Sequence, residues 1–405
     1  PFGGGKSGIV ALENMSKEER AQVIVHFSRM LGSYVEIYNP GPDVGTNDED
    51  MKTFAIYNGL NHVVSKTVDM GGNRIDLLGA AAGGVVVALD EIFSQLYKLR
   101  ELPQFKKYPL LKLEDATLMI QGFGAVGFNV AKLLAEGKLL TKCQKPPKLI
   151  GVSDKEGYLY AEKGFDIYEL LRLKTPDHIV SYGYYRHRKE HGLEKDFKFC
   201  NVPNDLLRES ADILVPATPI PNYVGMDTTY NPSVTVDQSG KWMIIVEAAN
   251  TLSVEKKRIE ERYRLEKILF QERGAFIAID YLVNSGGVIF AAYEKLVPTP
   301  KELDIPREIR GDREKVQEWL EKHKENFAQL AETRRKQAEQ KRDEVIRENI
   351  RVFIQNLVKH PDMLPSQVAR QISLERMIHQ DRFVKDVMHT HFAYAKPDMP
   401  IHQIA

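Results

Sequence analysis

Three glycines in a G-x-G-x-x-G pattern are the residues of this chain that best fit a ligand-binding task. Gly122, Gly124 and Gly127 follow an apolar run at 117–120 and precede a stretch with helical periodicity. In a dinucleotide-binding turn the first glycine permits the tight bend, the second admits the pyrophosphate, and the third lets helix and strand pack closely. An ordinary strand-to-helix turn is the alternative. The residues that we expect to contact a dinucleotide here are Gly122, Phe123, Gly124, Ala125, Val126 and Gly127.

An acidic residue at the end of the next strand supports the nucleotide interpretation. The run Lys148–Asp154 has the pattern of a buried strand, and Asp154 is placed to accept hydrogen bonds from the adenosine ribose hydroxyls. Its charge should repel a 2′-phosphate, so we expect NAD rather than NADP, although the adjacent Lys155 works against this preference. The gap from Gly127 to this strand is a little long, and residues 141–148 read as an inserted loop.

A lysine among glycines is a second candidate. Lys6 lies in a glycine-rich stretch over 1–8, where backbone N–H groups and the ammonium group could converge on a small anion. If neighbours and burial lower the pKa of Lys6, it could also give up its proton easily. A solvated lysine at a flexible chain end is the alternative, because the spacing is not that of a P-loop.

An aspartate in a stiff loop is a third candidate. Asp43 lies between Pro42 and a Val-Gly pair within a loop rich in turn-forming residues, so its position is fixed by the backbone. The alternative is that Asp43 only caps the helix expected over 49–58. Asn47 or Asp48 is better placed for that task.

Elements that can position these residues follow from the apolar periodicity. A helix is expected over 16–38, where Ser16 and Glu19 form a capping box. Three short apolar runs read as further buried strands, at 211–218, 241–250 and 274–280. Each ends in a small or polar residue, which puts ligand-contacting groups at the carboxyl edge of a parallel sheet. The residues that we expect to contact the cofactor from this edge are Ala217, Thr218, Asn250 and Asn284.

Composition excludes several classes of function. Lys plus Arg and Asp plus Glu number 56 each, so no bulk charge favours nucleic acid or an anionic membrane as a partner. Two cysteines argue against a disulfide scaffold or zinc cluster, and we expect no metal. The longest apolar run, 80–89, is too short to span a bilayer, and no secretory signal opens the chain. We therefore expect a soluble protein of a reducing compartment, either cytoplasm or mitochondrial matrix.

Five motifs occur in the order of a known family. They are Pro-Phe-Gly-Gly-Gly-Lys at 1–6, Pro-Asp-Val-Gly-Thr at 42–46, Gly-Phe-Gly-Ala-Val-Gly at 122–127, Val-Glu-Ala-Ala-Asn at 246–250, and Asp-Tyr-Leu-Val-Asn-Ser-Gly-Gly-Val-Ile at 280–289. Together they resemble the glutamate/leucine/phenylalanine/valine dehydrogenase superfamily. The resemblance implies oxidative deamination of an L-amino acid to a 2-oxo acid and ammonia by a homo-oligomer, with NAD or NADP as hydride acceptor.

The resemblance also assigns roles to single residues. It implies that Lys6 activates water for attack on the imine and that Asp43 relays protons to the amino nitrogen. An amine of near-neutral pKa beside a carboxylate can pass protons in both directions at pH 7. Gly3 and Gly4 are implied to contact the substrate. Ala291 stands where members that use glutamate have a serine for the distal carboxylate, so we expect an apolar amino acid such as leucine, valine or phenylalanine. Glutamate is the alternative, because the family's lysine for that carboxylate belongs to a segment that this sequence does not include.

Departures from the family keep a second function open. The sequence does not include the segment that precedes the glycine–lysine motif in the family, either because it was cut away or because a second polypeptide supplies it. The family's arginine- and threonine-containing stretch is poorly kept over 74–84. The alternative is therefore a catalytically weakened member that binds nucleotide as a structural or regulatory subunit.

The expected architecture is α/β, with a Rossmann-like, doubly wound dinucleotide-binding domain over 111–290. Residues 1–70 would form the remnant of a substrate domain, and 71–110 a connecting helix and linker. Residues 291–405 would form a C-terminal helical region, charged over 302–355 and extended over 393–405.

Overall fold

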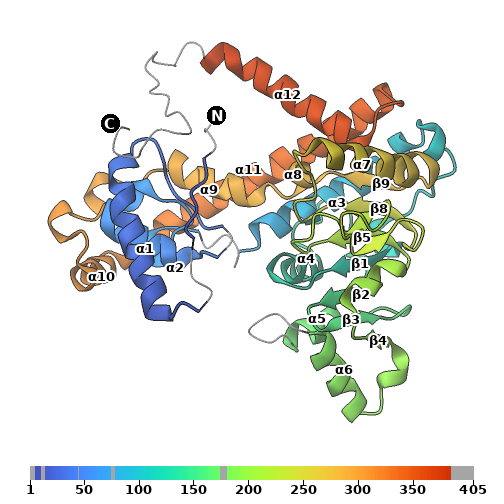
Figure 1. The fold of residues 1–405 in the computed structure, drawn as a ribbon, viewed down its shortest axis with the longest axis horizontal. Helices are drawn as coiled ribbons and strands as arrows, with labels where there is room; N and C mark the ends of the chain where they lie inside the picture. The colour runs from blue at the N-terminus through green and yellow to red at the C-terminus, as the bar shows by residue number, and fades with distance from the viewer. Residues whose placement is uncertain (1–4, 11–13, 44, 74–77, 174–179, 385–405) are drawn as a thin grey trace.

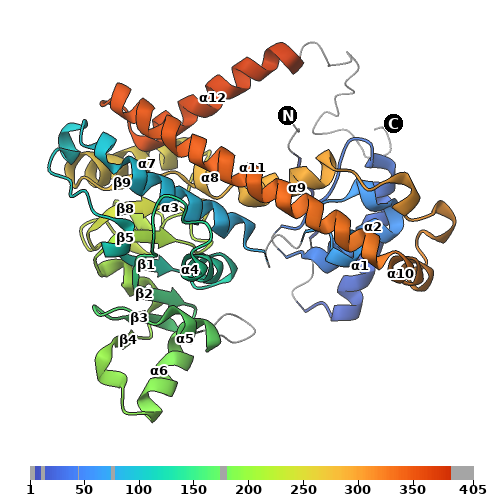
Figure 2. The same ribbon diagram turned by 180° about the vertical axis from the view of Figure 1, so that it is seen from behind.

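The computed structural model describes residues 5–10, 14–43, 45–73, 78–173 and 180–384, which form two lobes joined by long helices (Figures 1 and 2). The larger lobe is built on a seven-stranded sheet, and the smaller lobe is helical. Each lobe has its own hydrophobic core. The smaller core combines residues from 24–70 with residues from 305–327, and the larger core draws on residues 82–372.

The sheet of the larger lobe has the strand order β4-β3-β2-β1-β5-β8-β9. Its parallel strands are β1 (Thr117–Gln121), β2 (Lys148–Asp154), β5 (Ala211–Pro216), β8 (Trp242–Val246) and β9 (Phe276–Ala278). The chain runs outward from β1 to β2 and then continues on the other side of β1 at β5. This reversal beside β1 is the place where doubly wound sheets bind ligands, beyond the carboxyl ends of the strands. The expected doubly wound α/β fold is confirmed.

Two short antiparallel strands extend one edge of this sheet. They are β3 (Gly157–Tyr160) and β4 (Lys198–Cys200), and β3 pairs with β2. We expected the region 165–199 to be helical. It contains helices α5 (Ile167–Arg172) and α6 (Ser181–Glu190), but the chain then returns to the sheet as β4. A separate pair of two-residue parallel strands comprises β6 (Val224–Gly225) and β7 (Val234–Thr235).

Helices cover the sheet and connect it to the smaller lobe. Helix α3 is buried along most of its length, between the sheet and α11 (Figure 2). The other helices that cover or extend from this lobe are α3 (Ala80–Leu99), α4 (Ala125–Glu136), α7 (Lys256–Glu266), α8 (Asp280–Val283), α9 (Gly286–Leu296), α11 (Lys324–Lys359) and α12 (Pro365–Val384). A π-helical segment at Lys267–Glu272 continues α7.

The smaller lobe contains α1 (Lys17–Leu31), α2 (Asp48–Asn58) and α10 (Arg313–Lys322) (Figure 1). Helix α1 begins with the expected capping box of Ser16 and Glu19, but it ends at Leu31 and passes into a short 3-10 turn. Asn47 caps α2, so the interpretation of Asp43 as the cap of that helix is wrong.

The C-terminal helices contribute to the cores of both lobes. Ile305, Val316 and Phe327 lie in the core of the smaller lobe, whereas Ile350 and Phe353 lie in the core of the larger lobe. Helix α11 therefore belongs to both cores. The extended end expected over 393–405 lies outside the described residues. Among the described helices, none is long and apolar enough to cross a membrane.

A buried arginine fixes the first third of α11. The Arg334 side chain is fully buried and donates hydrogen bonds to the backbone oxygens of Gly71 at 2.6 Å and Val297 at 2.8 Å. Nearby, the buried Lys66 and Glu294 side chains form an ion pair at 2.7 Å. These contacts join the smaller lobe, the end of α9 and α11 at one place.

Candidate dinucleotide and catalytic site

The three glycines of the turn between β1 and α4 have three different environments. Gly122 has φ +92°, the left-handed conformation that favours glycine. A Cβ at Gly127 would lie 2.1 Å from the Gly122 carbonyl oxygen, so only glycine permits this approach of helix to strand. A Cβ at Gly124 would meet nothing within 4 Å. The turn is thus tight at its first and third glycines and open at its second, which fits the approach of a pyrophosphate.

Other residues of this turn contribute in different ways. Phe123 is buried and contacts Phe128, with ring centroids 5.8 Å apart, so its side chain serves the core. Ala125 is exposed and Val126 half-buried at the start of α4. Ser153 is a residue that sequence reasoning missed. Its hydroxyl accepts a hydrogen bond from the Gly122 N–H at 3.1 Å, and only its place at the end of a strand hinted at this role.

The ends of the neighbouring strands meet at the same edge. Thr218 follows β5, and its methyl group would lie 2.5 Å from a Cβ at Gly122, so the two residues are adjacent. The Thr218 hydroxyl is buried and has no hydrogen-bond partner among the described residues. Ala217 is held by a hydrogen bond from its N–H to the backbone carbonyl oxygen of Gln121 at 2.7 Å. The Asn284 side-chain amide donates to the Asn250 side-chain oxygen at 3.0 Å. The structure therefore brings the expected residues of this edge together in pairs.

Asp154 is used by the protein itself. Its two oxygens accept hydrogen bonds from the N–H groups of Val180 at 2.6 Å, Ser181 at 2.8 Å and Glu156 at 2.9 Å, and from the Ser181 hydroxyl at 2.6 Å. A carboxylate has about four acceptor positions, and these four donors fill them. In this structure no position is left for a ribose hydroxyl, so the expected hydrogen bonds from the adenosine ribose to Asp154 are not supported.

The two expected catalytic residues, which are 37 residues apart in sequence, contact each other. The Lys6 ammonium group donates a hydrogen bond to the Asp43 carboxylate and forms an ion pair with it. The contact is open to solvent, since the Lys6 side chain is 84% exposed and that of Asp43 is 57% exposed. The hydrogen bond and charge of Asp43 raise the pKa of Lys6 above its ordinary value. This corrects the expectation of a lowered pKa, because the burial needed to disfavour the ammonium form is absent at this exposed residue.

Hydrogen bonds hold the part of the loop that follows Asp43. The Asp43 N–H donates to the Thr46 hydroxyl at 2.8 Å, and the Thr46 N–H donates to the Asp43 carbonyl oxygen at 2.9 Å. Arg20 of α1 reaches the Gly45 carbonyl oxygen at 2.8 Å and the Asp50 carboxylate at 2.6 Å. Two helices therefore fix the position of Asp43.

Helix α9 connects the sheet edge to this loop. It begins two residues after Asn284, and its Lys295 donates a hydrogen bond to the Asn39 side-chain oxygen at 2.5 Å. Ala291 precedes Lys295 by one helical turn and so shares its face, directed toward the segment that leads to Asp43. Gly3 and Gly4 lie outside the described residues. Among the residues described, no cluster of histidine, cysteine and acidic side chains could hold a metal ion.

Comparison with known proteins gives the family. Residues 79–360 match the family Glutamate/Leucine/Phenylalanine/Valine dehydrogenase. The chain belongs to this family. The resemblance inferred from the five motifs is thereby confirmed.

Several members of this dehydrogenase family have similar sequences. The catabolic NAD-specific glutamate dehydrogenase RocG of Bacillus subtilis is 27% identical over 313 residues, and the match covers 73% of this chain and 59% of that protein. An NAD-specific glutamate dehydrogenase of Staphylococcus aureus is 27% identical over 346 residues, covering 83% of this chain and 70% of that protein. A glutamate dehydrogenase of Thermotoga maritima is 29% identical over 306 residues, covering 73% and 61%. The chain thus spans about 60–70% of the length of these relatives.

Solved structures of family members share the fold. Plasmodium falciparum glutamate dehydrogenase superposes with a TM-score of 0.52 at 17% identity, over 91% of this chain and 67% of that chain. The leucine-bound hetero-hexameric glutamate dehydrogenase of Thermus thermophilus gives a TM-score of 0.52 at 19% identity, over 92% and 71%. At these identities the likeness is one of fold.

Proposed function

We propose that the protein catalyses NAD-dependent, reversible oxidative deamination of an L-amino acid to a 2-oxo acid and ammonia. The observation that carries this proposal is the contact between Lys6 and Asp43 in a chain of this family. Helix α9 runs from the sheet edge at Asn284 to the loop segment at Asn39, so the nucleotide turn and the catalytic pair belong to one connected framework. The family match and the open turn at Gly124 support the same function.

The residues of the sheet edge fit a dinucleotide. The pyrophosphate would lie against Gly124 and the first N–H groups of α4, where the helix dipole favours negative charge. Thr218, Asn250 and Asn284 offer polar groups along the same edge. When bound, NAD supplies the hydride acceptor, and the protein holds the substrate Cα–H toward it. NAD is preferred to NADP in this proposal because the Bacillus and Staphylococcus relatives are named NAD-specific.

Lys6 and Asp43 supply the proton chemistry in this proposal. Neutral Lys6 accepts a proton from the water that attacks the imine, and Asp43 moves protons at the amino nitrogen. The raised pKa of Lys6 keeps it protonated while the pair is exposed. Closure of the lobes around substrate would remove water from the pair and favour the neutral amine, because burial disfavours charge.

Ala291 supports an apolar substrate. A glutamate side-chain carboxylate placed beside alanine would find no hydrogen bond there, and a buried carboxylate without partners costs a few kcal/mol. The names of the relatives support glutamate instead. We propose leucine, valine or phenylalanine as the class that is turned over faster, in a homo-oligomer.

The second candidate function is a nucleotide-binding structural or regulatory subunit with little activity. The exposure of Lys6 and Asp43 favours it, since an open ion pair holds the lysine in its protonated form. Rates of NADH and NADPH formation with leucine, valine, phenylalanine and glutamate separate the two functions. We expect turnover with NAD and an apolar amino acid that Lys6→Ala abolishes. Nucleotide binding without turnover of any of a full panel of amino acids would support the subunit instead.

A further inference from the structure

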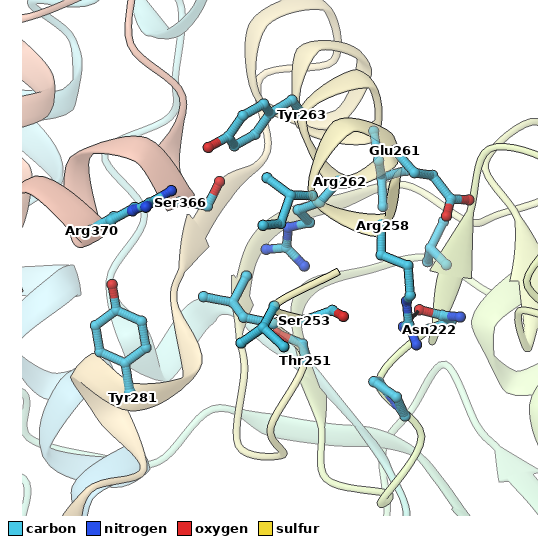
Figure 3. A pocket seen from close by; sticks show the side chains of 16 residues that line it. Asn222, Thr251, Ser253, Arg258, Glu261, Arg262, Tyr263, Tyr281, Ser366 and Arg370 are labelled. Carbon is cyan, nitrogen blue, oxygen red and sulfur yellow. Dashed lines mark hydrogen bonds between the residues drawn. The ribbon is translucent and has the colours of Figure 1, made fainter. Parts of the chain in front are cut away.

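A cavity of about 370 Å³ lies apart from the residues proposed for catalysis and for NAD (Figure 3). It is bounded by α7, by the start of α8 and by the first turns of α12. Its apolar wall includes Pro221, Val224, Leu252, Ile259 and Leu265. A volume of this size lies within the range of small-molecule sites in proteins, which combine an apolar wall with a few polar groups.

Three arginines line this cavity. Arg258 and Arg262 lie one turn apart on α7 and so share a face, and Arg370 extends from α12 toward the same space (Figure 3). Hydroxyl groups accompany them. Ser366 precedes Arg370 by one turn of α12, and Tyr281 points from α8 toward Arg370 (Figure 3). Three helices, α7, α8 and α12, thus bring polar side chains to one cavity.

Arg262 is held rigidly with one nitrogen left over. Its Nη1 donates to Glu247 at 2.7 Å and its Nε donates to Glu266 at 2.6 Å. The side chain is only 11% exposed, and Nη2 is buried with no hydrogen-bond partner among the described residues. A buried donor without an acceptor is costly, so an acceptor atom brought to this wall of the cavity would be stabilising.

Two arginines of the cavity wall have no ion pair among the described residues. Arg258 donates to the side-chain oxygen of Asn222, a neutral group, and within the described residues neither Arg258 nor Arg370 takes part in an ion pair. The acidic side chain of the wall, Glu261, accepts a hydrogen bond from the Met226 N–H at 3.3 Å. Arg258 and Arg370 thus bring two guanidinium groups without an ion pair to the wall, which also carries the Glu261 carboxylate, whereas Arg262 is paired with both Glu247 and Glu266.

We propose that this cavity is a binding site for a small organic monocarboxylate with an apolar body. The carboxylate lies among the arginines, which bind such groups through paired N–H donors, and the apolar body packs on the wall of Val224, Leu252 and Leu265. Thr251 also lines the cavity and precedes Leu252 directly. Thr251 follows Asn250 in sequence, but Asn250 itself does not line the cavity.

Titration calorimetry with 3-phenylpropanoate tests the site without any need for turnover. We expect the carboxylate to bind, and 3-phenylpropanamide, which has the same body without the charge, to bind at least about tenfold more weakly, equivalent to 1.4 kcal/mol. Inorganic phosphate, which lacks the apolar body, should also bind at least about tenfold more weakly. Equal affinity for the amide or for phosphate would overturn the assigned ligand class.

Variants locate the bound carboxylate. Arg258→Ala and Arg370→Ala should each weaken 3-phenylpropanoate by about tenfold or more while the melting temperature stays near that of the parent. Arg264→Ala removes an exposed arginine of α7 that is not part of the wall, and affinity should not change. Lys6→Ala separates this site from the proposed active site. Binding that is lost with Lys6→Ala and kept with Arg258→Ala would overturn the proposal, whereas the reverse pattern would support it even in an inactive protein.

Discussion

A side chain added at Gly124 enters open space, whereas one added at Gly127 meets the Gly122 carbonyl oxygen. Gly124→Val should therefore fold with a nearly unchanged melting temperature and lose at least about 100-fold in NAD affinity, because the valine would occupy the place of the pyrophosphate. Gly127→Val is the contrasting variant, and its melting temperature should fall markedly because helix and strand are forced apart. Unchanged NAD affinity of the Gly124 variant in calorimetry would contradict the assignment of this turn to pyrophosphate binding.

Lys6 offers a test that separates charge from proton transfer. Arginine keeps a positive charge beside Asp43 but cannot lose its proton near neutral pH. Lys6→Arg and Lys6→Ala should both lower kcat by at least about 100-fold, with NAD affinity little changed, if neutral Lys6 is the base. Activity that survives in Lys6→Arg would show that only the charge is needed.

The pH profile provides the control for this pair. Asp43 raises the pKa of Lys6, so kcat/KM should rise with pH as Lys6 loses its proton. In Asp43→Asn the carboxylate is gone and the pKa of Lys6 falls. The rising limb of the residual activity should therefore move to lower pH. A limb that stays in place would show that Lys6 is not the group whose titration limits the rate.

At the scale of elements, Asp154 joins the end of β2 to the start of α6. Removing its four hydrogen bonds in Asp154→Ala should lower the free energy of unfolding by about 1–3 kcal/mol, measured by urea denaturation. Asp154→Asn should change the ratio of kcat/KM for NAD and NADP by less than about threefold, because the carboxylate is engaged away from any ribose. A large rise in kcat/KM for NADP with unchanged stability would show that Asp154 contacts the ribose.

The sequence predicted the parallel strands well, because each is a short apolar run that ends at glycine or a polar residue. The bounds of β2, Lys148–Asp154, agree with the prediction. It did not predict β3 and β4, which are short and pair across about 40 residues, so local periodicity carries no signal of them. For the same reason the contact of Asp154 with Ser181, 27 residues away, was not foreseen. Periodicity also does not tell to which lobe a charged helix belongs, and α11 belongs to both.

At the scale of the whole molecule, two buried acids of α3 tie together distant segments. Asp90 accepts hydrogen bonds from the Cys143 N–H at 2.8 Å and Arg347 at 2.7 Å, and Glu91 accepts one from Arg351 at 2.8 Å. Burial opposes ionisation of both carboxyls, but these donors outweigh it and hold the pKa of each below its ordinary value.

Stability should therefore depend on these acids under acidic conditions. A carboxyl with a lowered pKa in the folded state stabilises the protein above its unfolded pKa of about 4, and this stabilisation is lost as the pH falls toward the folded pKa. Asp90→Asn should cost about 2 kcal/mol at pH 7 and less at pH 3.5, as measured by urea denaturation. Glu162→Gln, at an exposed glutamate, should change stability little at either pH. An equal loss for Asp90→Asn at both pH values would contradict this account.

Arg334 anchors α11 nearer to one end than to the other, so it divides the helix into a short arm and a long arm. Ten residues separate the anchor from the end at Lys324 and 25 separate it from the end at Lys359, so the second arm is 2.5 times the first. At 1.5 Å per residue, a rotation of about 5° around Arg334 moves the far end by roughly 3 Å. The short arm lies in the core of the smaller lobe, and the long arm lies over α3, which covers the sheet. A rotation of α11 around Arg334 would therefore displace the layer that covers the parallel strands more than the core of the smaller lobe.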